Sequence, residues 1–302
     1  MTAETSFWQP SVLLPFVTVS LIWGGTWIVI RDQLSVVPPS WSVCYRFILA
    51  AAAMFVLARL RGLPLMLDRQ GHFWAILIGL FQFSGNFNFV YRAELYVTSG
   101  LVAVMFALLI IPNALLGVVF LKQRISGMFI IGSLLAMAGV AALFVHEFEA
   151  AGQGFDALWL GIGFTILGIL SASIANIMQG TETLQRWPII TMLAWAMLWG
   201  VVINAAYALA TVGAPVVEWR WSYWGGIAYL ALAGSVVTFP LYFGLIRRIG
   251  PGRAAYSSTI VPVVAMVFST LFEGYVWTML AIIGGVLALA GLVIAMQARR
   301  PA

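Results

Sequence analysis

The polar residues that could bind a small solute lie inside long apolar runs of this sequence. The run 73–91 contains Gln82, Ser84, Asn86 and Asn88. At about 100° per residue on a helix, Ser84 and Asn88 share one face while Gln82 and Asn86 share another. A polar side chain that faces hydrocarbon costs free energy unless it finds a partner. Each face is therefore expected either to line a wet cavity or to bond a neighbouring helix.

Polar and aromatic side chains of the same kind recur in the other apolar runs. Ser173 and Asn176 lie one helical turn apart, and so do Thr238 and Tyr242. Their hydroxyl and amide groups can hydrogen-bond a polar solute, or they can bond a neighbouring helix. The residues predicted to bind substrate are Trp23, Thr26, Gln82, Asn86, Asn88, Met105, Ser173, Asn176, Thr238, Tyr242 and Ser258.

Trp23 lies near the middle of the first apolar run, four residues before Trp27. An indole at this depth can stack on an apolar substrate and donate one hydrogen bond, or it can pack against another helix. Tryptophans such as Trp41 and Trp219 lie near the ends of runs, where indoles favour the membrane interface. Trp23 differs from them and is therefore a candidate for substrate contact.

Arg46 is the only formal charge well inside an apolar run. A guanidinium at this depth can bind a substrate carboxylate, pair with Glu94 or Asp32, or extend to the membrane surface. The sequence leaves these alternatives open.

Prolines interrupt several of the apolar runs. A proline inside a helix frees a backbone carbonyl and bends the helix, which in a transporter can make a hinge or a simple packing kink. A gating or structural role is predicted for Pro112, Pro240 and Pro262.

Acidic residues and histidines are absent from the middles of the apolar runs. Proton-driven antiport usually depends on a titratable group inside the membrane, so facilitated diffusion is the expected mechanism. An intramembrane enzyme would need a nucleophile with its base, or a metal cluster, and the runs offer neither. The chain is therefore not expected to be an enzyme, and no cofactor or metal is expected.

The composition requires elements that cross a membrane. With 63% hydrophobic residues, 8% charged residues and a mean hydropathy of +1.02, the chain departs from the soluble average of roughly 45–50% apolar and 25% charged. The continuous apolar runs predict helices and not barrel strands, so the expected fold is an all-α polytopic membrane protein with ten spans. The predicted spans are 11–31, 40–58, 73–91, 97–121, 127–145, 156–178, 189–211, 222–246, 253–272 and 277–297.

Basic residues predict the orientation of these spans. With both termini in the cytoplasm, eleven of the 15 Lys and Arg residues lie in cytoplasmic segments and three lie outside. Basic residues in short loops resist translocation, so the cell membrane is the expected location and both termini are expected to be cytoplasmic. This topology explains the net charge of +5 better than nucleic-acid binding does. The first run is expected to be a retained helix and not a signal peptide.

The chain also contains an internal repeat. The stretch 99–143 resembles 253–294, with Pro112 answering Pro262. Residues 1–150 and 151–302 are therefore predicted to be two five-helix units. Since five is odd, the second unit enters the membrane upside down, which predicts an inverted repeat with a substrate site near the midplane. The expected partners are a small-molecule substrate and the lipid bilayer, and the expected state is a monomer.

Several segments identify a family. Trp23-Gly24-Gly25-Thr26-Trp27, Tyr45-Arg46-Phe47, the segment 95–101 and the repeated proline hairpins together resemble the EamA-type branch of the drug/metabolite transporter superfamily. The resemblance covers nearly the whole chain in two copies.

This resemblance implies a ten-helix exporter of small metabolites. The implied cavity is lined by the first four helices of each half, with the fifth helix at the periphery, and the implied role of Arg46 is structural or gating. The most similar group exports aromatic amino acids and methionine. A nucleotide-sugar or drug transporter of the same superfamily is the alternative, and an intramembrane enzyme is the remote one.

Overall fold

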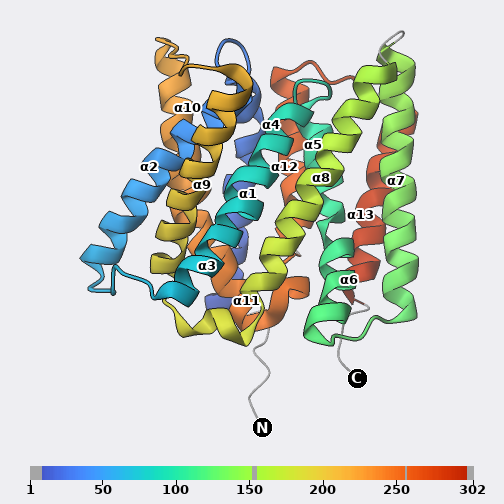
Figure 1. Cartoon of the computed structure of the whole chain (residues 1–302). Coiled ribbons are helices and arrows are strands. Elements are labelled where there is room, and N and C mark those ends of the chain that lie inside the picture. Colours follow the sequence, from blue (N-terminus) through green and yellow to red (C-terminus); the bar gives the residue numbers. More distant parts are fainter. Residues whose placement is uncertain (1–8, 152–154, 256, 298–302) are drawn as a thin grey trace.

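The computed structural model describes residues 9–151, 155–255 and 257–297. Within these ranges the chain is helical and contains no β-strand, as Figure 1 shows. Seven helical segments are long and apolar enough to cross a membrane, and three shorter apolar helices accompany them. The predicted all-α class is therefore confirmed for this part of the chain, whereas the count of ten crossings stays a prediction.

Short connections join the helices in chain order. The first part of the chain forms α1 (Pro10–Asp32), α2 (Pro39–Leu60), α3 (Arg69–Ile78), η1 (Gly79–Asn86), α4 (Phe87–Ala93), α5 (Ser99–Phe106), η2 (Ala107–Leu109), α6 (Ile110–Leu121) and α7 (Gly127–Ala151). The second part forms α8 (Phe155–Gln179), η3 (Glu182–Arg186), α9 (Ile189–Val212), α10 (Trp221–Ala231), η4 (Leu232–Val237), α11 (Thr238–Ala254), α12 (Ser257–Phe272) and α13 (Met279–Gln297).

Local sequence accounts for several helix ends. Pro10 and Pro39 begin α1 and α2, at positions where the missing N–H of proline costs nothing. The Asp68 carboxylate accepts a 2.7 Å hydrogen bond from the Gly71 N–H and caps α3. Gly250, with a φ of +82°, interrupts α11 in a backbone conformation that favours glycine.

Two of the long helices contain a π-helical turn. η1 separates α3 from α4, and η4 separates α10 from α11. Such a turn disturbs the regular hydrogen-bond ladder and makes backbone carbonyls available to other donors. The Phe81 carbonyl of η1 accepts from Ser171 of α8 at 2.7 Å, and the Gly234 carbonyl of η4 accepts from Trp23 of α1 at 3.2 Å. Each π turn is thus tied to a helix from the other part of the chain.

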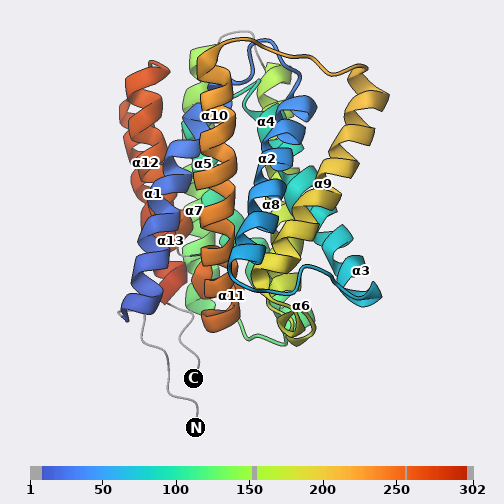
Figure 2. The ribbon, with the colours of Figure 1, turned by 90° about the vertical axis from the view of Figure 1, so that its left-hand side faces the viewer.

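Helices from the two parts of the chain interleave. α2 packs along α9, α1 along α12, and α8 against α4. Figure 2 shows α2 beside α9 and α10. α1 begins and α13 ends at the same end of the bundle, the lower end in Figures 1 and 2.

Helices α7 and α13 stand side by side at one edge of the bundle (Figure 1). A Cβ added at Gly139 would lie 2.5 Å from the Gly284 carbonyl oxygen, and one added at Gly132 would lie 2.6 Å from that of Gly291. The two backbones therefore touch directly, which residues without a side chain permit. These four glycines define what we call the glycine seam.

Candidate substrate cavity

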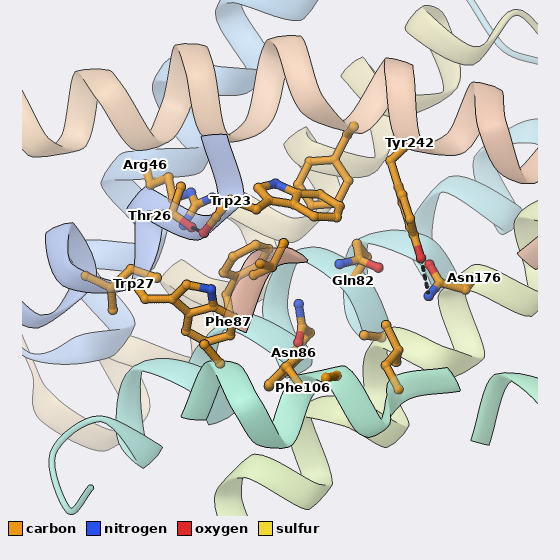
Figure 3. Close-up of a pocket in the computed structure, with 17 residues that line it drawn as sticks. Trp23, Thr26, Trp27, Arg46, Gln82, Asn86, Phe87, Phe106, Asn176 and Tyr242 are labelled. Carbon is orange, nitrogen blue, oxygen red and sulfur yellow. Dashed lines mark hydrogen bonds between the residues drawn. The ribbon is translucent and has the colours of Figure 1, made fainter. Parts of the chain in front are cut away.

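A cavity of about 100 Å³ lies within the bundle, where helices from both parts of the chain meet (Figure 3). α1, η1 and η2 contribute to its wall, and so do α8, α11 and α12. A space of this size holds several water molecules. Six of the residues predicted to bind substrate line it, namely Trp23, Thr26, Gln82, Asn86, Asn176 and Tyr242.

Aromatic rings form much of the cavity wall. The Trp23 ring lies 4.9 Å from that of Tyr242 and 5.5 Å from that of Phe239, in edge-to-face contacts. The ring of Trp27 lies 5.2 Å from that of Phe106. Edge-to-face rings of this kind hold one another in place and present apolar surface to a solute.

Several polar atoms lie between the aromatic rings of the cavity wall. The Asn176 side chain donates to the Tyr242 hydroxyl at 3.4 Å, a contact drawn in Figure 3. The Asn86 side-chain oxygen and the Trp27 indole nitrogen are buried and have no hydrogen-bond partner among the described residues. Because an unsatisfied buried polar atom is costly, such atoms in a cavity wall are suited to hydrogen-bond a solute.

Arg46 also lines the cavity, beyond the structural role that the family resemblance implies. Its Nε donates to the Ser235 hydroxyl at 3.2 Å, and its Nη2 donates to the Gly234 carbonyl at 3.4 Å. The guanidinium carbon lies 4.3 Å from the ring centre of Phe87, a cation–π distance. Neither Glu94 nor Asp32 forms an ion pair with Arg46, so the carboxylate partners considered from the sequence are corrected to neutral oxygens and a ring.

Three other predicted binding residues do not line this cavity and bond to neighbouring parts of the protein instead. The Asn88 amide donates to Asn204 of α9 at 2.7 Å. The Ser173 hydroxyl donates to Asn113 of α6 at 2.7 Å, and the Thr238 hydroxyl donates to the Gly234 carbonyl at 2.7 Å.

Two further residues predicted to bind substrate are not among the described residues that line the cavity. Met105 is buried in α5 and is absent from the cavity wall. The side chain of Ser258 falls outside the part of the chain that the structure describes.

The three prolines occupy different surroundings. Pro112 lies near the start of α6, and Pro240 lies in α11, three residues beyond the π turn η4. Pro262 of α12 lines a second cavity, of about 220 Å³, whose wall is apolar and includes residues of α13. None of the three lines the cavity that contains Arg46.

Four aromatic residues of the cavity wall were not predicted from the sequence to bind substrate: Trp27, Phe87, Phe106 and Phe239. Trp27 carried a usable signal, because it follows Trp23 at i, i+4 spacing. The phenylalanines carried none, since the sequence contains 20 of them and they are spread over most of the apolar runs.

A second polar cluster lies where α1, α4, α5 and α12 end or begin. Ser99 and Ser269 donate to the Glu273 carboxylate at 2.7 and 2.6 Å, and Arg31 lies 3.9 Å from it. Arg31 also donates to the backbone carbonyl of Glu94. The Glu94 side chain is buried, and neither of its oxygens has a hydrogen-bond partner among the described residues. Burial and the neighbouring charge of Glu273 raise the pKa of Glu94 well above its usual range, while Arg31 lowers it.

Comparison with known families identifies this arrangement. The model of the EamA-like transporter family matches residues 11–145 and again residues 159–297. The chain belongs to the EamA-like transporter family. Family membership and the names of its relatives indicate a transporter and not an enzyme.

Named relatives of this EamA-like protein are distant but nearly full-length. Protein PagO of Salmonella typhimurium is 25% identical over 88% of this chain and 86% of its own. The uncharacterized transporter YoaV of Bacillus subtilis is 23% identical over 93% of this chain and 95% of its own. A probable amino-acid metabolite efflux pump of Salmonella typhimurium is 25% identical over 91% of both chains.

A crystal structure of another protein shares the fold. It superposes with a TM-score of 0.72 over 95% of this EamA-like chain and 96% of its own, at 18% identity. At that identity the likeness concerns the fold alone.

Proposed function

We propose that this protein exports small metabolites, foremost amino acids with aromatic side chains and methionine. The observation that carries this proposal is the cavity, to which both parts of the chain contribute aromatic and polar side chains. Aromatic rings suit an apolar side chain, and the amide and indole groups suit the polar ends of a zwitterion. The relative named as a probable amino-acid metabolite efflux pump supports the same substrate class.

We infer ten membrane crossings, arranged as two inverted five-helix units, 1–150 and 151–302. The two successive matches of the family model support this organisation. So do the π turns, because η1 and η4 interrupt the third long helix of each unit. The glycine seam also supports it, because its contacts are reciprocal: Gly139 approaches Gly284, and Gly132 approaches Gly291. In such a repeat, alternating access comes from one unit rocking against the other around the site.

Facilitated diffusion is the proposed mode of transport, by a monomer. The only formal charge among the residues that line the described cavity is Arg46, which does not change protonation state at physiological pH. A positive charge in the wall also disfavours a cationic drug as the substrate. The distribution of Lys and Arg supports a cell-membrane location with both termini in the cytoplasm.

Efflux from proteoliposomes tests this function. We expect liposomes that contain the protein to release preloaded labelled phenylalanine, tryptophan or methionine faster than empty liposomes do. Counterflow should persist in the presence of a protonophore. Equal release from both kinds of liposome would refute the substrate class, and counterflow that collapses with the protonophore would refute facilitated diffusion.

A further inference from the structure

Arg46 carries a buried positive charge that no described carboxylate neutralises. Its side chain is 1% exposed. The ion pairs among the described residues involve Arg31 and Arg220 instead. The acidic residues of the described chain lie at helix ends or in connections, away from the middles of the long helices. Because an unpaired charge inside a membrane protein is costly, such a residue points to a function.

The present partners of Arg46 are weak ones for a guanidinium. They are the hydroxyls of Ser235 and Tyr91, the backbone carbonyl of Gly234 and the aromatic ring of Phe87. One guanidinium nitrogen, Nη1, is buried without a hydrogen-bond partner among the described residues. A guanidinium has five N–H donors in a planar fork, and a carboxylate is the acceptor that matches this fork.

The Gly234 carbonyl is shared among more donors than it can serve well. It accepts from Trp23 at 3.2 Å, from Arg46 at 3.4 Å and from Thr238 at 2.7 Å. A carbonyl oxygen has two lone pairs, so three donors compete for them. The contact with Arg46 is the longest of the three and is therefore the easiest to give up.

We propose that Arg46 binds the carboxylate of the transported substrate, and that Gly234 and Ser235 of η4 hold the guanidinium while the cavity is empty. This inference rests on the proposed export of amino acids and names the group that selects them. A carboxylate bound to Arg46 places the rest of the molecule among the aromatic rings of Trp23 and Phe239. The unpartnered Asn86 oxygen is then available to the ammonium group.

The exchange of partners links binding to the position of α11. Arg46 of α2 and Trp23 of α1 both hold η4, which leads directly into α11. A substrate carboxylate forms charge-assisted hydrogen bonds, which are about twice as strong as neutral ones. Binding therefore releases one of the ties between α2 and η4, at the place where a π turn already bends the helix. Figure 3 shows Arg46 toward one end of the cavity, with Tyr242 and Asn176 toward the other.

Three compounds of similar size separate carboxylate recognition from aromatic recognition. L-Phenylalanine, 3-phenylpropionate and 2-phenylethylamine share the phenyl ring and differ in their charged groups. In isothermal titration calorimetry, we expect the purified wild-type protein to bind the two carboxylates at least about 10-fold more tightly than the amine. Efflux of the same three labelled compounds from proteoliposomes measures transport separately.

Substitutions at Arg46 and Ser235 are expected to act in opposite directions. Arg46→Gln should weaken binding of both carboxylates by about 10-fold or more and leave the amine within about threefold. Arg46→Lys, which keeps the charge, should recover part of the loss. Ser235→Ala removes one competing partner of the guanidinium and should tighten carboxylate binding by about threefold. Arg59→Gln is the matched control, because Arg59 is an exposed arginine of the same helix.

The outcomes distinguish this inference from the proposed function. Equal wild-type binding of all three compounds, or binding by none of them, overturns the assignment of Arg46. Carboxylate binding that Arg46→Gln leaves unchanged also overturns it, even where phenylalanine is exported. Carboxylate-selective binding without any efflux supports Arg46 and refutes the export function. If Arg46→Gln does not fold, the wild-type series and Ser235→Ala decide, and weaker carboxylate binding by Ser235→Ala contradicts the proposal.

Discussion

The glycine seam and the central cavity are opposite solutions to packing helices in a membrane. In the seam, the backbones of α7 and α13 touch so closely that no room remains for a methyl group. In the cavity wall, Asn86, Trp27 and Arg46 keep polar atoms that no described residue satisfies. The helix contacts of the seam therefore need no ligand, whereas the cavity wall keeps polar atoms that a ligand could satisfy.

This difference separates two kinds of contribution. Close contact between small residues stabilises a helix pair and offers nothing for a solute to bind. Unsatisfied polar atoms lower the stability of the empty protein, and a bound solute that hydrogen-bonds them restores it. Changes in the seam should therefore alter stability, and changes in the cavity should alter which solutes are bound.

The largest effect is expected in the seam. In Gly139→Ala, the added methyl carbon would lie 2.2 Å from the Ala288 nitrogen and 2.5 Å from the Gly284 oxygen, so the helices must move apart. We expect a loss of about 3 kcal/mol in the free energy of unfolding, visible as a large fall in melting temperature in detergent.

Gly285→Ala is the control for this substitution. Gly285 is a glycine of α13 whose added Cβ would meet nothing within 4 Å. Alanine there should be neutral or stabilising by up to about 1 kcal/mol, because it favours the helix. Equal melting temperatures for the two variants would show that the seam is not tightly packed.

The next effect concerns the aromatic wall. Trp23→Phe keeps a ring beside Phe239 and Tyr242 but removes part of its area and one donor to Gly234. We expect phenylalanine to bind about fivefold more weakly, a difference of about 1 kcal/mol, with little change in melting temperature. Stability should hold because Gly234 keeps its other donors.

Trp199→Phe provides the comparison for Trp23. The Trp199 indole donates to His72 at 3.4 Å and does not line the cavity. Its substitution should leave phenylalanine binding unchanged. A similar loss of binding in both variants would argue against a specific role for Trp23.

The seam and the cavity also differ in how well sequence predicts them. Continuous apolar runs determine helices because a lipid-exposed backbone must satisfy its own hydrogen bonds, and the run 40–58 accordingly lies within α2. The repeated segments 135–139 and 287–291 contain two of the seam glycines, Gly139 and Gly291, although the repeat alone does not predict that α7 and α13 touch. The end of α7 is less well predicted, since the helix extends to Ala151 and not to residue 145.

The cavity is harder to predict because a polar side chain has two possible partners. The structure places Gln82 and Asn86 in the cavity wall and Asn88 against α9, but spacing in the sequence does not say which face meets a helix. Asn204 of α9, distant in sequence, satisfies Asn88 and so leaves the other face to the cavity. The π turns have no clear sequence signal, and η4 supplies two of the neutral partners of Arg46, Ser235 and Gly234.

Glu94 tests whether unsatisfied polar atoms outside the cavity behave like those inside it. Its pKa is raised by burial and by Glu273, so the folded protein holds this proton more tightly than the unfolded chain does. Stability is then greatest below the ordinary glutamate pKa of about 4.3, and it falls as the pH rises through the raised pKa.

Glu94→Gln should remove much of this pH dependence. Between pH 5 and pH 8, we expect the wild-type protein to lose stability on the order of 1 kcal/mol, and the variant to lose less and to melt above the wild type at pH 8. Melting temperatures in detergent across this pH range measure both. The exposed Glu182 supplies the control variant, Glu182→Gln, which should follow the wild type. A wild-type melting temperature that rises with pH would contradict the assignment.

The smallest effect on stability is expected at Arg220, which has several hydrogen-bonded and charged partners but is exposed to solvent. Its guanidinium bonds Asp32 at 3.2 Å, Ser35 at 2.8 Å and the Glu218 carboxylate, and thereby joins the end of α1 to the start of α10. The side chains of Arg220 and Asp32 are 43% and 47% exposed, so water and salt screen their attraction.

Asp32→Asn should therefore change the free energy of unfolding by less than about 1 kcal/mol, and 1 M salt should abolish the difference. Denaturation of both proteins at low and high salt measures this. A larger, salt-resistant loss would mean that the tie between α1 and α10 acts as a buried contact. Arg46 and Arg220 would then differ less than their surroundings indicate, since substituting an exposed, fully paired arginine should affect stability less than substituting a buried one that has no carboxylate partner.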